Sequence, residues 1–224
     1  FTPAEQELLE QRAVARREYG ADIRLLSGHE AKLIEPGIPE SCLSAAYCET
    51  DGFASAYLTG KAFHEALRLA GVTIIENADD NITPPGESYR ISANQGDLQI
   101  QANRLVLAGG VWLEPLLALI GITLPVKTLI NQLIVTERMP PVMRTVLSIA
   151  NGLLSMKQFA NGTVVIGGGW QGRGHRDSGK PETVPENLIG NLRLGQYVCP
   201  ALAEARVARI WLGLESETAD AMPM

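Results

Sequence analysis

The stretch 104–112 reads Arg104-Leu105-Val106-Leu107-Ala108-Gly109-Gly110-Val111-Trp112. Its short apolar run, bounded by turn residues, predicts a fully buried strand. The two glycines remove Cβ atoms where the chain turns sharply and where a ligand or another backbone comes close. Residues 113–120 are apolar and predict a helix, with Glu114 and Pro115 in its first turn. A strand, a glycine turn and a helix can form a phosphate cradle, although an ordinary strand-to-helix connection would show the same local pattern.

The composition is that of an ordinary globular protein. The chain has 224 residues, enough for one large domain or two small ones. Hydrophobic residues make up 46% and charged residues 20% of it. A formal net charge of -6 without any dense basic run argues against a nucleic-acid surface. No apolar segment is long enough to span a bilayer, so no membrane span is expected.

The cysteines and histidines show no spacing that would indicate a bridge or a metal site. Cys42, Cys48 and Cys199 fit neither a disulfide framework nor a CxxC zinc pattern. We therefore expect reduced thiols in a cytoplasmic protein. The three histidines lie far apart in the sequence, and we expect no metal site.

Segments with helical periodicity alternate with strand-like runs along the chain. Helices are expected from Pro3 to about Tyr19, with Thr2 as N-cap and Glu5 as its capping-box partner, after Ser27, and over residues 56–70 and 186–197. Strands are expected at 23–26, 45–48, 72–75, 89–93, 98–102, 126–137, 146–149, 153–159, 163–166 and 207–214, with turns at 84–86 and 94–97. This mixture predicts an α+β fold with interleaved α/β pieces.

A second glycine-rich stretch, residues 167–172, matches the G-x-G-x-x-G spacing after a predicted strand. The dinucleotide-binding fingerprint also requires a helix that opens at the last glycine and packs on the sheet. Here the polar, glycine-rich segment 173–180 follows and ends at Pro181. The pattern therefore favours a mobile surface or pocket-rim loop, with a solvated His175. Otherwise the sequence shows no nucleophile, general base or catalytic grouping, so the catalytic residues stay unknown.

Five stretches together resemble a family of flavoenzymes. They are Leu26-Ser27-Gly28-His29-Glu30-Ala31 with Glu35-Pro36; Asp51-Gly52-Phe53; residues 105–112; residues 124–127 through 132–137; and Trp211-Leu212-Gly213-Leu214 through Thr218-Ala219-Asp220. In order and separation they resemble the FAD-dependent amine and amino-acid oxidoreductases of the D-amino-acid oxidase, glycine oxidase and sarcosine oxidase superfamily. Within that superfamily the likeness is to the glycine-oxidase-like subunits, including those of hydrogen cyanide synthase.

The resemblance implies two domains threaded through each other. Residues 1–48 and 122–208 would form the substrate domain, a mostly antiparallel sheet with flanking helices. Residues 49–121 and 209–224 would form part of an FAD-binding domain. Ala108, Gly109, Gly110 and Trp112 would then lie beside the FAD. The positions that hold a tyrosine and an arginine on the substrate carboxylate in glycine-oxidase-like members are here Ser155 and Glu215. Because a glutamate repels a carboxylate, a secondary or more basic amine becomes an alternative to a plain α-amino acid.

The resemblance also sets the expected activity. The family's N-terminal FAD-binding motif and its C-terminal segment are not matched, so we expect a portion of a longer protein that is inactive and does not hold FAD by itself. The intact protein would oxidise the C–N bond of a small amine or amino acid to an imine, with hydride transfer to the flavin. The alternative is a non-catalytic binding or assembly module on the same fold. Self-association or a partner subunit is expected in either case.

Overall fold

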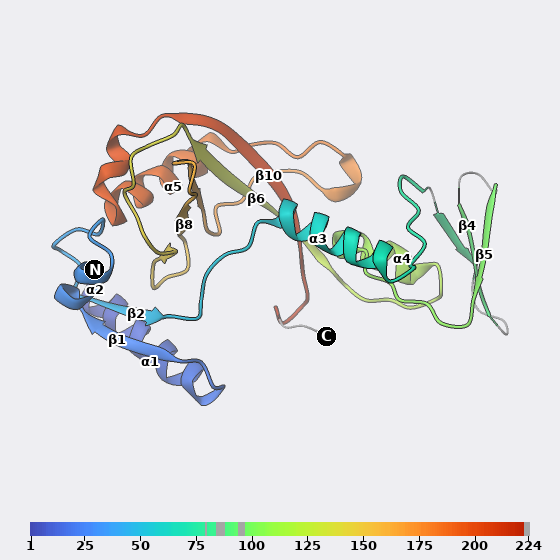
Figure 1. Cartoon of the computed structure of the whole chain (residues 1–224), viewed down its shortest axis with the longest axis horizontal. Helices are drawn as coiled ribbons and strands as arrows, with labels where there is room; N and C mark the ends of the chain where they lie inside the picture. The colour runs from blue at the N-terminus through green and yellow to red at the C-terminus, as the bar shows by residue number, and fades with distance from the viewer. Residues whose placement is uncertain (79, 84–87, 94–96, 222–224) are drawn as a thin grey trace. The chain divides into compact units, whose positions relative to one another are not determined.

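The backbone divides between two compact units, and it enters each of them twice. In the computed structural model, which describes residues 1–78, 80–83, 88–93 and 97–221 (Figure 1), the first unit contains residues 1–53 and 130–213. The second unit contains residues 54–129 and those from Leu214 onward. The mixed α/β architecture and its antiparallel sheets agree with the predicted fold class. Which unit holds substrate and which holds FAD stays a prediction.

The main sheet of the first unit has the strand order β10-β6-β9-β8-β7. Its pairing from β6 to β7 is antiparallel, and these strands lie within segments predicted to be extended, except that β9 continues one residue further, to Gly167. The bounds are β6 Lys127–Thr136, β7 Leu147–Ser148, β8 Ser155–Gln158, β9 Val164–Gly167 and β10 Val207–Glu217. Helix α5 (Pro185–Val198) and the short 3₁₀ turns η3 (Arg176–Ser178) and η4 (Pro200–Glu204) lie between β9 and β10 in the sequence.

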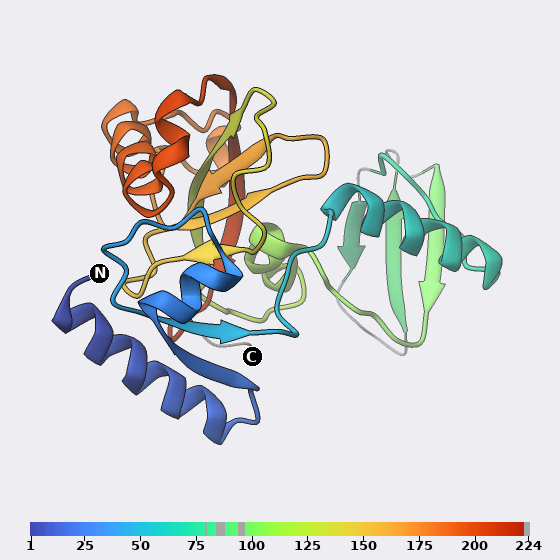
Figure 2. The ribbon, with the colours of Figure 1, turned by 60° about the vertical axis from the view of Figure 1, so that its left-hand side comes forward.

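One face of this sheet packs against α5, as Figure 2 shows. Ile134, Ile166, Met156 and Leu147 stand opposite one another across four strands, and the first three are at most 1% exposed. The same cluster includes apolar residues of α5 and η4. Side chains alternate between the two faces of a strand. The residues of β6, β8 and β9 that are adjacent in sequence to this row therefore point to the opposite face of the sheet.

The N-terminal part of the first unit is a helix–strand–helix–strand layer. It contains α1 (Pro3–Glu18), β1 (Ile23–Ser27), α2 (Gly28–Ile34) and β2 (Ser44–Cys48), and β1 pairs with β2 antiparallel. The predicted capping box of α1 is present, because the Glu5 N–H donates to Thr2 Oγ1 over 3.2 Å and the Thr2 N–H donates to the Glu5 carboxylate over 3.0 Å. Ser27 and Glu30 make the same pair at α2.

A buried carboxylate ties this layer to the sheet. Glu35, which follows α2, is 4% exposed. Its Oε2 accepts hydrogen bonds from the backbone N–H groups of Arg144 and Thr145 over 2.7 and 2.8 Å, and from the Thr145 hydroxyl over 3.0 Å. These bonds hold the segment before β7 against the end of α2. The charge of Glu35 therefore has a structural use.

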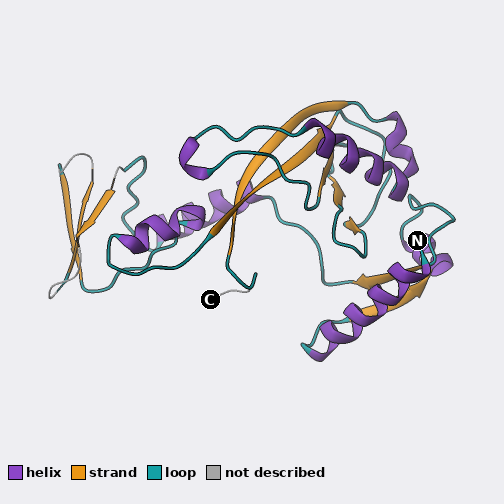
Figure 3. Ribbon diagram, turned by 180° about the vertical axis from the view of Figure 1, so that it is seen from behind, coloured by secondary structure: helices purple, strands orange, loops and turns teal. Residues whose placement is uncertain are grey.

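The second unit contains a small antiparallel sheet of three strands, which Figure 3 draws in orange. Its strands are β3 (Asp80–Thr83), β4 (Tyr89–Ala93) and β5 (Leu98–Ala102), and its helices are α3 (Ala56–Leu69), the 3₁₀ turn η2 (Gly110–Trp112) and α4 (Leu113–Ala118). The pairing of β4 with β5 confirms the predicted hairpin. The predicted turns at 84–86 and 94–96 lie outside the described residues.

Two predicted strands do not form. Residues 72–75 and 105–107 belong to no sheet of the described chain, and Val72 and Val106 are 47% and 87% exposed. A strand is completed by hydrogen bonds from a neighbouring segment, and an apolar run does not specify that partner. Within the described residues, neither segment has a neighbouring strand, so the prediction of buried strands at these positions is wrong for this structure.

The packing of α5 generates a first prediction. A Cβ on Gly190 would lie 2.5 Å from the Trp170 ring, whose indole N–H donates to the Leu153 carbonyl over 2.7 Å. Gly190→Ala should therefore displace the ring and cost about 1–3 kcal/mol of unfolding free energy. On Gly195 in the same helix, a Cβ would meet Met156 Sδ at an ordinary 3.4 Å. Gly195→Ala should be neutral or gain about 0.5–1 kcal/mol from helix propensity. Urea unfolding measures both, and equal effects would contradict the packing.

The Glu35 contacts generate a second prediction. Glu35→Ala leaves the N–H groups of residues 144 and 145 without their carboxylate and should cost about 1.5–3 kcal/mol of unfolding free energy. The control is Glu40→Ala, because the Glu40 side chain is 88% exposed and its ion pair with Lys32 lies at the surface. That variant should change the free energy by at most about 1 kcal/mol. Thermal unfolding of the two variants compares them, and a Glu35→Ala protein as stable as Glu40→Ala would show that these bonds contribute nothing.

Candidate functional site

The glycine turn of the second unit is a tight, left-handed reversal before α4. Gly110 has a φ of +56°, and the Trp112 N–H donates to the Gly109 carbonyl over 3.0 Å. Val111 is 3% exposed and anchors the turn. The sequence pattern thus predicts the turn and the helix after it, but the strand expected in front of it does not form.

The two glycines serve different purposes. A Cβ on Gly109 would lie 2.5 Å from Leu116 Cδ1, so this glycine lets the turn pack against α4. A Cβ on Gly110 would meet nothing within 4 Å. Gly110 therefore combines a backbone conformation that disfavours side chains with open space beside it. Such a position admits the close approach of a ligand to the backbone.

The residues around Gly110 fit a flat, largely apolar group. Trp112 is 52% exposed, and Ala108 is exposed as well. An exposed indole ring next to bare backbone offers stacking and van der Waals contact without adding a charge. The turn therefore fits part of a flavin dinucleotide, and these few residues cover only a portion of such a ligand.

The first unit presents a second candidate surface, the face of the main sheet that α5 does not cover. Ser155 is exposed on β8 and stands opposite Gly167 of β9. Two residues further along β8, Lys157 stands opposite Val165, which in turn stands opposite Val135 of β6. Residues directly opposite in an antiparallel sheet share a face. We call these residues, with Leu133 packed over Gly167, the open face, because α5 does not cover them; Val135, Val165 and Gly167 are nevertheless buried.

Two aromatic rings border the open face beside Lys157. Phe53 and Phe159 pack edge to face with ring centroids 5.1 Å apart. The Lys157 ammonium lies 5.4 Å from the centroid of the Phe53 ring. The family motif does not single out Lys157, although the alternation of β8 places it on the same face as Ser155. Its contact with Phe53 comes from a segment remote in sequence.

Glu215, the other predicted substrate residue, is exposed on β10. It belongs to the part of β10 assigned to the second unit, whereas Ser155 belongs to the first. The structure therefore brings residues 108–112 together in one turn. Ser155 and Glu215, in contrast, belong to different units. Their joint role in holding a substrate stays a prediction.

Gly167 ends β9, and residues 168–172 form a loop without a dinucleotide-binding helix, as predicted. An isolated antiparallel bridge joins Gln171 to Asn131, and another joins Arg173 to Glu182. No helix opens at Gly172, and the next helical element is the three-residue turn η3. This geometry excludes the fingerprint that the spacing alone suggests.

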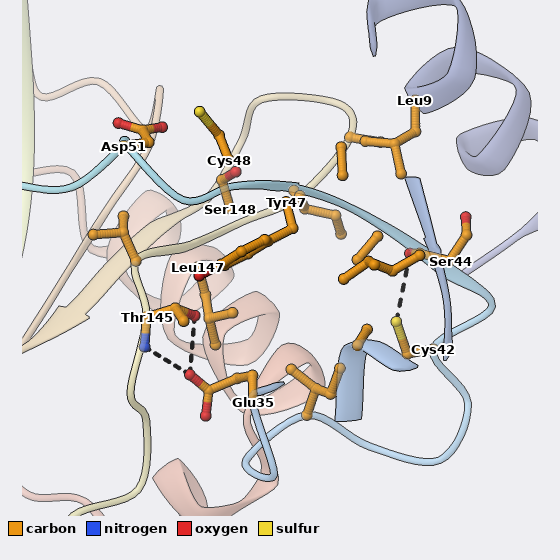
Figure 4. Close-up of a pocket in the computed structure, with 18 of the residues that line it drawn as sticks. Leu9, Glu35, Cys42, Ser44, Tyr47, Cys48, Asp51, Thr145, Leu147 and Ser148 are labelled. Atoms are coloured by element: carbon orange, nitrogen blue, oxygen red, sulfur yellow. Dashed lines mark hydrogen bonds between the residues drawn. The ribbon is translucent and has the colours of Figure 1, made fainter. Parts of the chain in front are cut away.

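A cavity of about 710 Å³ lies in the first unit between the N-terminal layer and the segment 144–154. Figure 4 shows Glu35 at its wall with the carboxylate directed at Thr145, and the Cys42 thiol directed at the Ser44 carbonyl. Burial raises the pKa of the Cys42 thiol, so it is a poor nucleophile at neutral pH. The pKa of Cys199 is raised by burial and by the nearby Glu35 charge. The Glu35 carboxylate and the Cys42 thiol thus both form hydrogen bonds within the protein at this cavity.

Two further findings concern the described residues. None of their helices has the length and apolar character needed to cross a bilayer. Within the same residues, no group of three or more histidine, cysteine or acidic side chains is arranged to hold a metal ion.

The chain is similar to several known oxidoreductases. It is 27% identical over 190 residues to an opine oxidase subunit from Rhizobium meliloti, a match that covers 84% of this chain and 48% of that protein. It is 28% identical over 207 residues to the hydrogen cyanide synthase subunit HcnC of Pseudomonas aeruginosa, covering 90% and 48%. The chain thus spans about half the length of these curated relatives.

A solved structure shows the same fold. Glycine oxidase from Geobacillus kaustophilus superposes with a TM-score of 0.83 at 22% identity, covering 99% of this chain and 58% of that one. The family model described as DAO, FAD dependent oxidoreductase, matches residues 1–224. This match over the whole chain shows that the chain belongs to the DAO family of FAD-dependent oxidoreductases.

Proposed function

We propose that this chain forms part of an enzyme that oxidises the C–N bond of an amine or amino acid to an imine. The observation that carries the proposal is the turn at Gly110, where left-handed backbone, open space and the exposed Trp112 ring occur together. When bound, FAD supplies the hydride acceptor. The names of the similar proteins, opine oxidase, glycine oxidase and hydrogen cyanide synthase subunits, support amines or amino acids as the substrate class.

The chain's own residues would position the two reactants. Gly110 would let the flavin reach the backbone, and Trp112 would lie against it. Ser155 would offer a hydroxyl, which donates one hydrogen bond and accepts others. By the resemblance, Ser155 and Glu215 stand where glycine-oxidase-like members have a tyrosine and an arginine, and this pair would then grip a plain α-carboxylate weakly. Substrates with a secondary amine, or with their carboxylate held elsewhere, are therefore favoured.

Two features of the proposal concern the surroundings of the enzyme. The similar opine oxidase and hydrogen cyanide synthase proteins are named as subunits, and we propose that this chain also works with a partner subunit. All three cysteines are free thiols, which agrees with a reducing compartment such as the cytoplasm.

The test uses the protein as the cell produces it, with its partner subunits. Flavin content is measured first, and glycine, sarcosine, proline and an N-carboxymethyl amino acid are then added without oxygen. Loss of the visible flavin absorbance, together with the carbonyl product of imine hydrolysis, is the expected result for at least one of them. A protein that carries no flavin, or whose flavin none of these amines reduces, would contradict the proposal and favour the binding or assembly module.

The turn provides a prediction with a matched control. Gly110→Ala adds a methyl group where we place the flavin, and should weaken flavin binding about 10-fold, or about 1.4 kcal/mol. Gly121→Ala introduces the same backbone strain, since Gly121 has a φ of +76° and nothing within 4 Å of its Cβ position. Both variants should lose a similar stability of about 1–2 kcal/mol. Flavin titration of the two proteins separates strain from contact, and equal flavin affinities would remove Gly110 from the site.

A further inference from the structure

The open face carries a positive charge beside buried apolar residues. Lys157 stands in register with Val165 and Val135, which are 5% and 4% exposed. A Cβ on Gly167 would lie 2.4 Å from Leu133 Cδ2, so leucine covers the neighbouring position. Ser155 and Lys157 are the two residues of β8 on this face, about 6.6 Å apart along the strand.

The ammonium of Lys157 has an aromatic neighbour and lacks an acidic one. It lies over the Phe53 ring, and among the residues that the structure describes no carboxylate pairs with it. A cation over an exposed ring gains only about 0.5–1 kcal/mol. An ammonium that meets a carboxylate through a charge-assisted hydrogen bond gains more, about 1.5–3 kcal/mol. Lys157 therefore keeps capacity for an anionic ligand.

The rings at this position are accessible to a ligand. Phe53 is 47% exposed, and its edge-to-face contact with Phe159 fixes the ring without covering it. Ser155 is exposed two residues away on the same strand. A ligand at Lys157 would thus meet one cation, one hydroxyl and an aromatic wall. This combination matches an anion attached to an apolar framework.

We propose that Lys157, with Phe53 and Phe159, forms a subsite for the carboxylate of the substrate, and that the substrate class is amines with a carboxylate on an apolar or aromatic framework. The inference rests on the proposed function, because it takes the open face as the substrate side. It also gives the carboxylate a binding group, because Ser155 and Glu215 would hold a carboxylate only weakly. Lys157 is then a specificity-determining residue that binds and orients the substrate.

The experiment measures ligand binding by calorimetry on the intact protein, without turnover. The probe is phenylacetate, and phenylacetamide is its uncharged counterpart of nearly the same shape. Phenylacetate should bind the wild-type protein more tightly than phenylacetamide. Lys157→Met, which keeps the length of the side chain, should weaken phenylacetate binding about 10-fold or more and leave phenylacetamide unchanged. Lys157→Arg should restore the affinity for phenylacetate to within a few-fold.

The chain offers a matched control on another element. The Lys61 ammonium lies 5.4 Å from the centroid of the Tyr57 ring on α3, the same cation–ring distance as at Lys157. Lys61→Met removes an equivalent charge and should leave phenylacetate binding unchanged. Melting temperatures check that the variants are folded, and Lys157→Gln replaces the methionine variant should that one unfold. The wild-type comparison of the two probes needs no variant.

The outcomes test the Lys157 subsite and the proposed oxidase function independently of each other. If phenylacetate fails to bind, binds no better than phenylacetamide, or binds equally well after Lys157→Met, the subsite is refuted even where amines reduce the flavin. An equal loss for both probes would show that Lys157 only maintains the surface, and would also overturn the inference. Binding that depends on Lys157 in a protein whose flavin no amine reduces would leave the subsite standing and refute the oxidase proposal.

Discussion

The packing of α5 on one face of the main sheet determines the use of the other face. Ile134, Ile166 and Met156 stand in one row and are almost completely buried. A shift of one residue in β8 would move Met156 out of the core and bring Lys157 into it. Burying an unpaired ammonium among these apolar side chains would cost several kcal/mol. The apolar row thus fixes the register, and the register places Ser155 and Lys157 on the open face.

Side-chain hydrogen bonds hold the segments that border this sheet. Gln158, on the same face of β8 as Met156, accepts from the backbone N–H groups of Val142 and Met143 and donates to the Pro140 carbonyl. Glu35 binds the backbone just beyond, at residues 144 and 145. Both side chains satisfy partly buried backbone groups in a segment that has no strand partner of its own. A connection without regular structure is ordered in this way, and β7 enters the sheet at a defined position.

The sequence predicts best those features that depend on neighbours along the chain. The capping boxes at Thr2 and Ser27 are formed within three residues, and the pattern specifies them directly. The glycine turn at 109–110 is equally local. The strands expected at 72–75 and 105–107 require partners from elsewhere, and apolar character alone does not provide them. The contact of Phe53 with Lys157 is missed for the same reason, since it depends on how the segment after β2 meets β8 in space.

The two candidate regions differ in how specifically they choose a ligand. In its proposed role the turn at Gly110 would act through the absence of a side chain and through shape, with bare backbone beside an indole ring facing the flavin. In the proposed subsite the open face would act through charge, because the Lys157 ammonium would attract a carboxylate more than its neutral analogue. A cofactor site has to be retained while substrates change. Under the proposal, replacing a single charged side chain on a fixed sheet would alter which substrate is held, and it would leave the register, the core and the turn at Gly110 intact.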